Sequence, residues 1–279
     1  MIFPTAFNTI PDALSGPGLL PSLPLELKER TLIRLPGAVC DRDPGPHFKW
    51  AHDIARQLIV ASRTSQIFVV IGAGRLGGKH ALELTAGFDR RCSSRMGRLG
   101  TASNAEVLTQ CLKQQGAQVV IQRLTIIPED AEDYSMVKAD QRLNDGAIVI
   151  FGGGEQYPDP EKPGKKLDYT TDMVALRRAN ELDVRRLIIA REDRTTDGPT
   201  EAYRRRRSRR SQSLPEHLSF AQARTASRYE FHEETLNRAA ELRRPVRVVM
   251  LDRYDLNDPK PGRNVEAAAQ GAAIGTLIS

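Results

Sequence analysis

The 279-residue chain lacks the features that mark membrane, exported and disulfide-stabilised proteins. No apolar run approaches the roughly 18 residues that a membrane-spanning helix needs, and no basic segment followed by an apolar stretch opens the chain. Cys40, Cys92 and Cys111 are far apart and lack CxxC spacing, which argues against a disulfide framework and against a zinc site. We therefore expect a cytoplasmic protein that neither enters nor crosses a membrane.

The sequence also lacks a familiar catalytic or metal-binding grouping. Its histidines show no metal-ligand spacing, and no Ser-His-Asp or Cys-His arrangement is suggested. The formal net charge of +6 comes from one local tract, Arg204–Arg210, which holds six arginines in seven positions and without which the charges balance. Such a tract is more often a solvated loop than a binding surface, so we expect no binding to nucleic acid.

What the sequence does contain is an alternation of apolar, strand-like runs with amphipathic, helix-like stretches. Residues 1–28 are proline-rich and predict an extended arm, whereas 29–279 predict one domain. The expected strands are 31–35, 66–71, 118–122, 147–151, 186–190, 246–251 and 274–278. The expected helices are 47–63, 78–87, 102–115, 134–143, 171–182, 229–242 and 262–270. This alternation predicts an α/β fold, a three-layer α/β/α sandwich around a mainly parallel sheet.

Three of the expected strands run directly into glycine-containing turns. The turns are Pro36-Gly37, Gly72-Ala73-Gly74-Arg75 and Gly152-Gly153-Gly154. Because the carboxyl ends of parallel strands lie along one edge of a sheet, the three turns can meet there. Backbone N–H groups in such turns hold phosphates and other anions. The sequence therefore predicts an anion-binding site at this edge.

Charged residues stand near the same expected edge. Arg34 lies inside the first apolar run, where it either pairs with an anion or is a strand end whose head group reaches water. Arg191 follows the run 186–190 beside Glu192 and Asp193, which could neutralise it or hold a metal ion. Asp172, in Thr170-Thr171-Asp172, either caps the first turn of a helix or orients cations around a phosphate.

At these residues the chain resembles the amino acid kinase superfamily, in its uridylate kinase branch. The resemblance covers about 31–279 and is most specific in the closing Gly275-Thr276-Leu277-Ile278. The turn Gly72-Ala73-Gly74 and the pair Thr171-Asp172 are also similar to family motifs. The long segment between Gly154 and Thr171 resembles that of the molybdenum storage proteins, whereas uridylate kinases make this connection in a few residues.

The resemblance implies a protein that binds ATP with Mg²⁺ and assembles into homo- or hetero-oligomers, with the hexamer as the usual size. From the residues themselves we expect charge-arranging catalytic roles for Arg34, Asp172 and Arg191, and a metal site at Glu192 and Asp193. The nucleotide would contact Gly37, Gly72, Ala73, Gly74, Arg75, Gly152, Gly153, Gly154 and Thr171. The family's first strand ends in lysine, one residue and two glycines, whereas this chain has Arg34-Leu35-Pro36-Gly37, so its catalytic motif departs from the family pattern.

Three functions are compatible with these features. The leading expectation is an ATP-binding protein of the molybdenum-storage type, which would take molybdate as a further ligand. The first alternative is a uridylate kinase-like phosphotransferase that acts on a nucleoside monophosphate. The second is a catalytically silent subunit that binds nucleotide only to assemble with an active homologue. In each case the expected partners are a nucleotide and an oxyanion.

Overall fold

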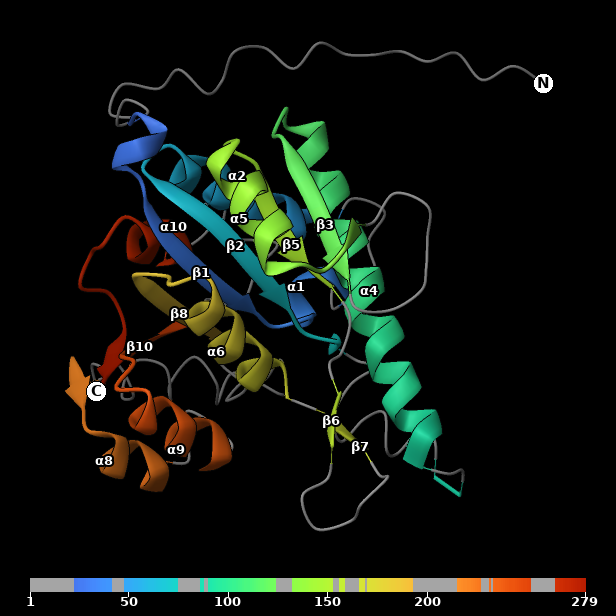
Figure 1. Cartoon of the computed structure of the whole chain (residues 1–279), viewed down its shortest axis with the longest axis vertical. Coiled ribbons are helices and arrows are strands. Elements are labelled where there is room, and N and C mark those ends of the chain that lie inside the picture. Colours follow the sequence, from blue (N-terminus) through green and yellow to red (C-terminus); the bar gives the residue numbers. More distant parts are fainter. Residues whose placement is uncertain are drawn as a thin grey trace, which may run out of the picture.

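A nine-stranded sheet with helices on both faces forms the centre of the described part of the chain (Figure 1). The computed structural model describes residues 23–41, 48–74, 86–87, 90–123, 132–152, 156–158, 166–168, 170–192, 215–226, 231, 233–251 and 264–279. The strand order is β4-β3-β5-β2-β1-β8-β10-β11-β9. Neighbouring strands pair in parallel, and among these pairs only β10 and β11 are antiparallel. The mainly parallel sheet expected from the sequence is thus confirmed.

The strands of this sheet are short to medium in length. They are β1 (Glu29–Leu35), β2 (Ser65–Ile71), β3 (Val119–Arg123), β4 (Glu132–Asp133), β5 (Ile148–Phe151), β8 (Arg186–Glu192), β9 (His217–Leu218), β10 (Val246–Leu251) and β11 (Thr276–Ile278). A separate antiparallel pair consists of β6 (Gln156–Pro158) and β7 (Lys166–Asp168).

The described helices cover the two faces of the large sheet. They are η1 (Leu25–Leu27), α1 (Ala38–Asp41), α2 (Lys49–Ser62), α4 (Arg90–Gln114), α5 (Met136–Asn144), α6 (Thr171–Glu181), α8 (Phe220–Thr225), α9 (Glu233–Glu241) and α10 (Asn264–Ala269). In the described part of the chain, no helix has the length and apolar character needed to span a bilayer.

Alternating strand side chains build a separate core on each face of the sheet. In β1, Ile33 and Leu35 pack with α1, α2, α4 and α10, whereas Leu32 packs with α5, α6 and α9 on the other face. The same alternation in β2 sends Ile67 to the first core and Phe68 to the second. Both faces are therefore sealed from water, which confirms the predicted α/β/α sandwich (Figure 1).

The structure differs from the sequence-based prediction mainly in α4 and in the shortest strands. Helix α4 begins at Arg90, not at 102, and its first half extends beyond the sheet (Figure 1). Its early part contains Gly97 and Gly100 and shows no clear apolar stripe, so periodicity did not reveal it. The short strands β4, β6, β7 and β9 hold two or three residues, which is too few for alternation to be recognised.

Some predicted segments lie outside the described residues. They are the arm up to residue 22, nearly all of the expected helix 78–87 and the tract Arg204–Arg210. The described end of the arm contacts the domain, because the Leu23 amide donates to the Arg63 carbonyl at 2.8 Å and Lys28 Nζ donates to the Ser62 carbonyl at 2.7 Å.

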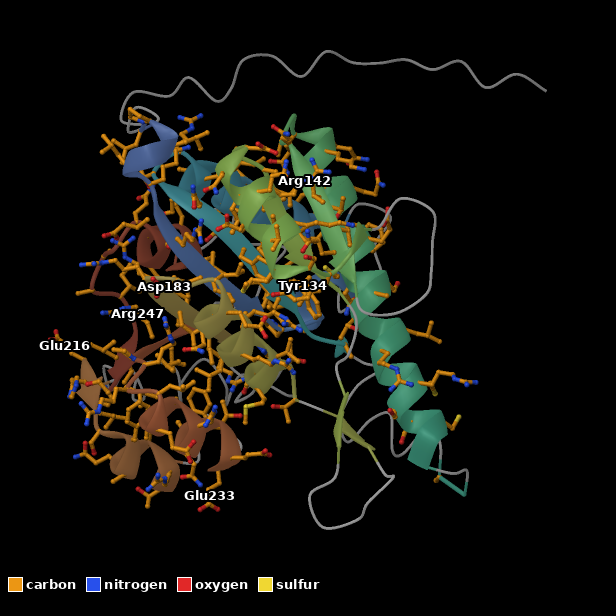
Figure 2. All side chains as sticks on the ribbon, in the orientation of Figure 1. Tyr134, Arg142, Asp183, Glu216, Glu233 and Arg247 are labelled. Atoms are coloured by element: carbon orange, nitrogen blue, oxygen red, sulfur yellow. The ribbon has the colours of Figure 1, made fainter. Side chains whose placement is uncertain are left out.

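A buried arginine of α6 contacts the connection between β4 and α5 and the carboxyl end of β5. The guanidinium of Arg178 is 3.8 Å from the ring centre of Tyr134 and 5.1 Å from that of Phe151, and it pairs with Glu181. The Tyr134 hydroxyl donates to the same carboxylate at 2.7 Å, and burial together with this hydrogen bond raises the pKa of Tyr134 well above its usual value. Figure 2 shows Tyr134 inside the molecule, whereas Glu216 and Glu233 lie at its periphery. Because Phe151 directly precedes Gly152, this cluster helps to fix the end of β5.

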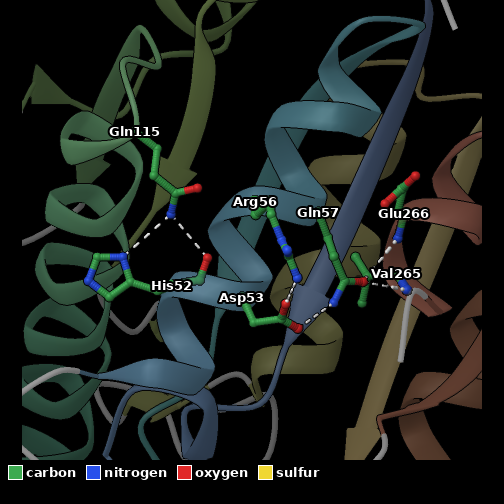
Figure 3. Close-up of polar contacts among 7 residues, drawn as sticks. All are labelled: His52, Asp53, Arg56, Gln57, Gln115, Val265 and Glu266. Carbon is green, nitrogen blue, oxygen red and sulfur yellow. Dashed lines mark hydrogen bonds and ion pairs between the residues drawn. The ribbon is translucent and has the colours of Figure 1, made fainter. Parts of the chain in front are cut away.

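A buried glutamine attaches helix α10 to α2 (Figure 3). Gln57 Oε1 accepts hydrogen bonds from the backbone N–H of Val265 at 3.2 Å and of Glu266 at 3.4 Å. Its Nε2 donates to Asp53 Oδ2 at 2.9 Å, and Asp53 also pairs with Arg56. Gln57 thus satisfies two amides of the first turn of α10, which have no partner within that helix.

Replacing Gln57 with leucine is expected to lower the free energy of unfolding by about 1–3 kcal/mol, because the amides of Val265 and Glu266 lose their acceptor. Urea unfolding followed by circular dichroism measures this change. The matched control is Gln110→Leu, at an exposed position of α4, where we expect a change within about 0.5 kcal/mol. Equal unfolding midpoints for the two variants would show that the Gln57 contacts do not stabilise α10.

Candidate functional site

The turns that follow β5, β2 and β1 lie along one edge of the sheet. These strands are parallel neighbours, and their ends are in register: Leu35 pairs with Ile71, and Val70 pairs with Phe151. The next residues are Pro36 after β1, Gly72 after β2 and Gly152 after β5. The shared edge predicted from the sequence is confirmed for these described turns.

The turn after β1 and the turn after β2 contact each other so closely that no side chain fits between them. A Cβ atom added to Gly37 would overlap the backbone nitrogen of Gly74 and the carbonyl oxygen of Gly72, and would lie 2.5 Å from Asn104 Nδ2. The amide of Gly72 also donates to the carbonyl of Leu35 at 2.9 Å. Glycine at position 37 is therefore a steric requirement of this junction.

Helix α4 packs against the turns at Gly72 and Gly152. Asn104 Nδ2 donates to the Gly72 carbonyl at 2.9 Å, and a Cβ atom added to Gly152 would lie 2.5 Å from the Cβ atom of Ala105. No pattern in the sequence pointed to Asn104. An asparagine inside an expected helix gives no signal of its own, because its partner lies 32 positions away in the chain.

Beside the turns, one carboxylate holds two guanidinium groups. Arg34 Nε is 2.8 Å from Asp172 Oδ1, Arg191 Nη1 donates to Asp172 Oδ1 at 3.1 Å, and Arg191 Nη2 pairs with Asp172 Oδ2. The side chains are 14%, 4% and 11% exposed for Arg34, Asp172 and Arg191, so the cluster is largely removed from water. Arg34 Nη1 also donates to the Ala190 carbonyl of β8 at 3.4 Å. We call these three residues the Arg-Asp-Arg cluster.

Strand alternation explains why the two arginines meet. Arg34 follows Leu32 on the α6 face of β1, and Arg191 follows Ile189 on the α6 face of β8. Thr170 provides the N-cap of α6, since its Oγ1 accepts from the Met173 amide at 3.2 Å. Asp172 lies in the first turn of α6 and pairs with both arginines, so Arg34 has an anionic partner within the protein. The role of Asp172 in orienting cations around a phosphate stays a prediction.

An aromatic ring from the C-terminal part of the chain completes the cluster. The guanidinium carbon of Arg191 lies 4.8 Å from the ring centre of Phe231, a distance at which a cation is attracted to the face of the ring. Phe231 packs against both the α6-side core and the smaller core around Ala223 and Leu236. No motif in the sequence pointed to this residue, because the contact arises from tertiary packing alone.

The remaining predicted site residues are only partly described. Thr171 is the first residue of α6, and the backbone of Glu192 ends β8. Arg75, Gly153, Gly154 and Asp193 lie outside the described residues. Among the residues that the structure describes, no three His, Cys, Asp or Glu side chains gather as metal ligands. The metal site at Glu192 and Asp193 therefore remains a prediction.

The geometry is suited to an anion. Two permanently charged guanidiniums meet at one carboxylate in a poorly solvated position. The turn after β2 lies next to these guanidiniums, since a Cβ atom added to Gly72 would be 3.7 Å from Arg34 Nη2. A phosphate placed there would meet both positive charge and backbone donors.

Comparison with known proteins decides the family. The model of the amino acid kinase family matches residues 29–198. The chain belongs to the amino acid kinase family. That match includes the described glycine turns and the whole Arg-Asp-Arg cluster, so the family resemblance inferred from the sequence is confirmed at the level of the family.

The similar proteins are uridylate kinases. The chain is 29% identical over 236 residues to the uridylate kinase of Clavibacter michiganensis. This alignment covers 81% of this chain and 86% of that protein. The chain is 28% identical over 256 residues to the uridylate kinase of Leifsonia xyli. This alignment covers 90% of this chain and 97% of that protein. The crystal structure of UMP kinase from Bacillus anthracis has a TM-score of 0.66 at 24% identity and covers 90% of this chain and 96% of that chain.

These comparisons revise the order of the three functions expected from the sequence. They support the uridylate kinase-like alternative, and they give no support to the leading expectation of a molybdenum storage protein. That expectation depended on the length of the connection between Gly154 and Thr171, and the comparisons add no support for it.

Proposed function

We propose that this protein is a uridylate kinase-like phosphotransferase, which transfers the γ-phosphoryl group of ATP to a nucleoside monophosphate, with UMP as the preferred acceptor. The observation that carries the proposal is the Arg-Asp-Arg cluster beside the glycine turns at the carboxyl edge of the sheet. Similarity to uridylate kinases along most of the chain supports the choice of acceptor.

In the proposed reaction, a phosphate oxygen of UMP attacks the γ-phosphorus of ATP. The new P–O bond gives UDP, and the bond between γ-phosphorus and the bridging oxygen breaks to release ADP. Charge on the transferring oxygens is the main quantity that the protein can stabilise in such a step. Arg34 and Arg191 supply positive charge, and Asp172 holds both of them in place without touching the phosphoryl group.

The described residues do not fit a resident magnesium site. Both oxygens of Asp172 are engaged by guanidiniums, and no group of three His, Cys, Asp or Glu side chains gathers among the described residues. We therefore assign the charge in this step to the two arginines, and Mg²⁺ enters the proposal only as the ion that accompanies ATP in the assay. The expected oligomer, a hexamer by resemblance, is part of the same proposal and can be measured by sedimentation.

The test is incubation of the purified protein with ATP, Mg²⁺ and UMP, with separation of the nucleotides by chromatography. We expect UDP and ADP to form in equal amounts. ADP formed without UDP, together with molybdenum retained on the protein after addition of molybdate, would favour the storage function instead. Absence of turnover except after coexpression with an active homologue would favour the silent subunit.

A further inference from the structure

We propose that Asn104 is a positioning residue that turns the amide of Ala73 toward the bound phosphate. The inference rests on the proposed function, because it concerns how one glycine turn of that site presents its backbone. Asn104 lies on α4, on the opposite face of the sheet from the Arg-Asp-Arg cluster, and it acts through the peptide group between Gly72 and Ala73.

Asn104 is the buried junction between α4 and two of the loops at the edge. Its side chain is among the buried polar groups, at 5% exposure. Nδ2 donates to the Gly72 carbonyl at 2.9 Å, while its own backbone carbonyl accepts from Cys40 Sγ at 3.4 Å. The side-chain amide also occupies the space beside Gly37, since a Cβ atom there would lie 2.5 Å from Nδ2.

The hydrogen bond to Gly72 determines the direction of the next amide. In a planar trans peptide, the C=O and the following N–H point in opposite directions. Because the Gly72 carbonyl points at α4, the Ala73 N–H must point away from α4, toward the face of the sheet on which Arg34 lies. Within the described residues, the Ala73 N–H donates to no backbone carbonyl. It is therefore available to a phosphate oxygen.

The chemistry requires a donor at this position. A carboxylate of the same shape would place an oxygen against the Gly72 carbonyl oxygen, and the resulting repulsion would rotate the peptide. A protonated carboxyl group, in contrast, can donate an O–H and restore the contact. Asn104→Asp is therefore a variant of nearly unchanged shape in which pH controls the donor.

The experiment measures the dissociation constant of Mg·ATP for Asn104→Asp and for the unmodified protein between pH 5.5 and pH 8. Burial and the neighbouring carbonyl raise the pKa of the introduced carboxyl group, so the donor should return as the pH falls. Among the described residues, the Cys40 thiol contacts the Asn104 carbonyl, and the Arg34 guanidinium lies near Gly72 and is paired with Asp172. The unmodified protein, measured in parallel, corrects for protonation of ATP.

We expect Asn104→Asp to bind ATP about tenfold more weakly than the unmodified protein at pH 8, and the ratio to approach one at pH 5.5. The control Thr109→Val, at a buried position of the same helix whose hydroxyl donates within α4, should match the unmodified protein at every pH. Weakened binding that does not depend on pH, or no weakening at all, would overturn the positioning role.

A second measurement needs no nucleotide and separates this inference from the proposed function. In nucleotide-free protein, the ¹³C shift of the Gly72 carbonyl and the shift of the Ala73 amide should differ between Asn104→Asp and the unmodified protein at pH 8 and converge at pH 5.5. If these shifts follow the expected titration but the unmodified protein binds no ATP, the proposed function is wrong and the positioning contact stands. If the shifts are the same in both proteins at every pH, the positioning contact is wrong.

Discussion

Replacing Asp172 with asparagine is expected to reduce phosphoryl transfer about 100-fold, because the two arginines lose the group that orients them. The same change removes the carboxylate that pairs with two largely buried guanidiniums, which should lower the free energy of unfolding by about 3 kcal/mol. Initial rates of UDP formation and urea unfolding measure the two effects on one preparation. We expect the turnover rate to fall by a larger factor than the affinity for ATP. The positive charge of Arg34 and Arg191 remains, but Asp172 no longer holds the two guanidinium groups in position.

The matched control is Asp140→Asn, which removes the carboxylate partner of Arg30. Both side chains of that pair are more exposed, at 24% for Arg30 and 44% for Asp140, so a change within about 1 kcal/mol and unchanged turnover are expected. Turnover of Asp172→Asn equal to that of the Asp140→Asn control would exclude Asp172 as the organiser of the site.

Replacing Gly37 with alanine is expected to abolish nucleotide binding, because the added methyl group occupies space held by the next turn. Its Cβ would overlap the Gly74 nitrogen and the Gly72 carbonyl oxygen, and backbone atoms cannot move aside as a flexible side chain can. The two turns must separate, at a cost of about 1–3 kcal/mol in the free energy of unfolding. Equilibrium binding of ATP and urea unfolding together test this expectation.

Gly116→Ala is the control for the loss of a glycine elsewhere. Gly116 has φ +81° and nothing lies within 4 Å of an added Cβ, so alanine there meets strain in the backbone but no clash. We expect about 1 kcal/mol of destabilisation and unchanged binding of ATP. ATP affinity of Gly37→Ala equal to that of Gly116→Ala would mean that close contact between the turns is not needed for binding.

Much of the fold could be predicted because the strands in the middle of the sheet are mostly apolar in sequence. A strand that is buried on both faces needs such a run. The runs of β1 and β2 each end at a turn that contains glycine, so the order of the elements and the shared edge could be predicted from the sequence. The position of Arg34 inside an apolar run was also informative, since a charge there needs a partner. The structure supplies Asp172 as that partner.

The residues that could not be predicted are those whose role depends on contacts distant in the chain. Asn104 and Phe231 belong to segments whose local pattern specifies at most a helix, and their partners become visible only after α4 and the C-terminal segment have packed. The expectation of storage, which the comparisons do not support, depended on the length of one connection, and that length reports on neither the cluster nor the turns.

Calorimetric titration of Mg·ATP into the unmodified protein and into Gly37→Ala tests most directly whether the glycine turns and the Arg-Asp-Arg cluster bind nucleotide phosphates. We predict saturable heat with one ATP bound per chain for the unmodified protein and no saturable heat for the variant. A flat titration of the unmodified protein, or the same isotherm for both proteins, would contradict the assignment of this edge as the nucleotide site.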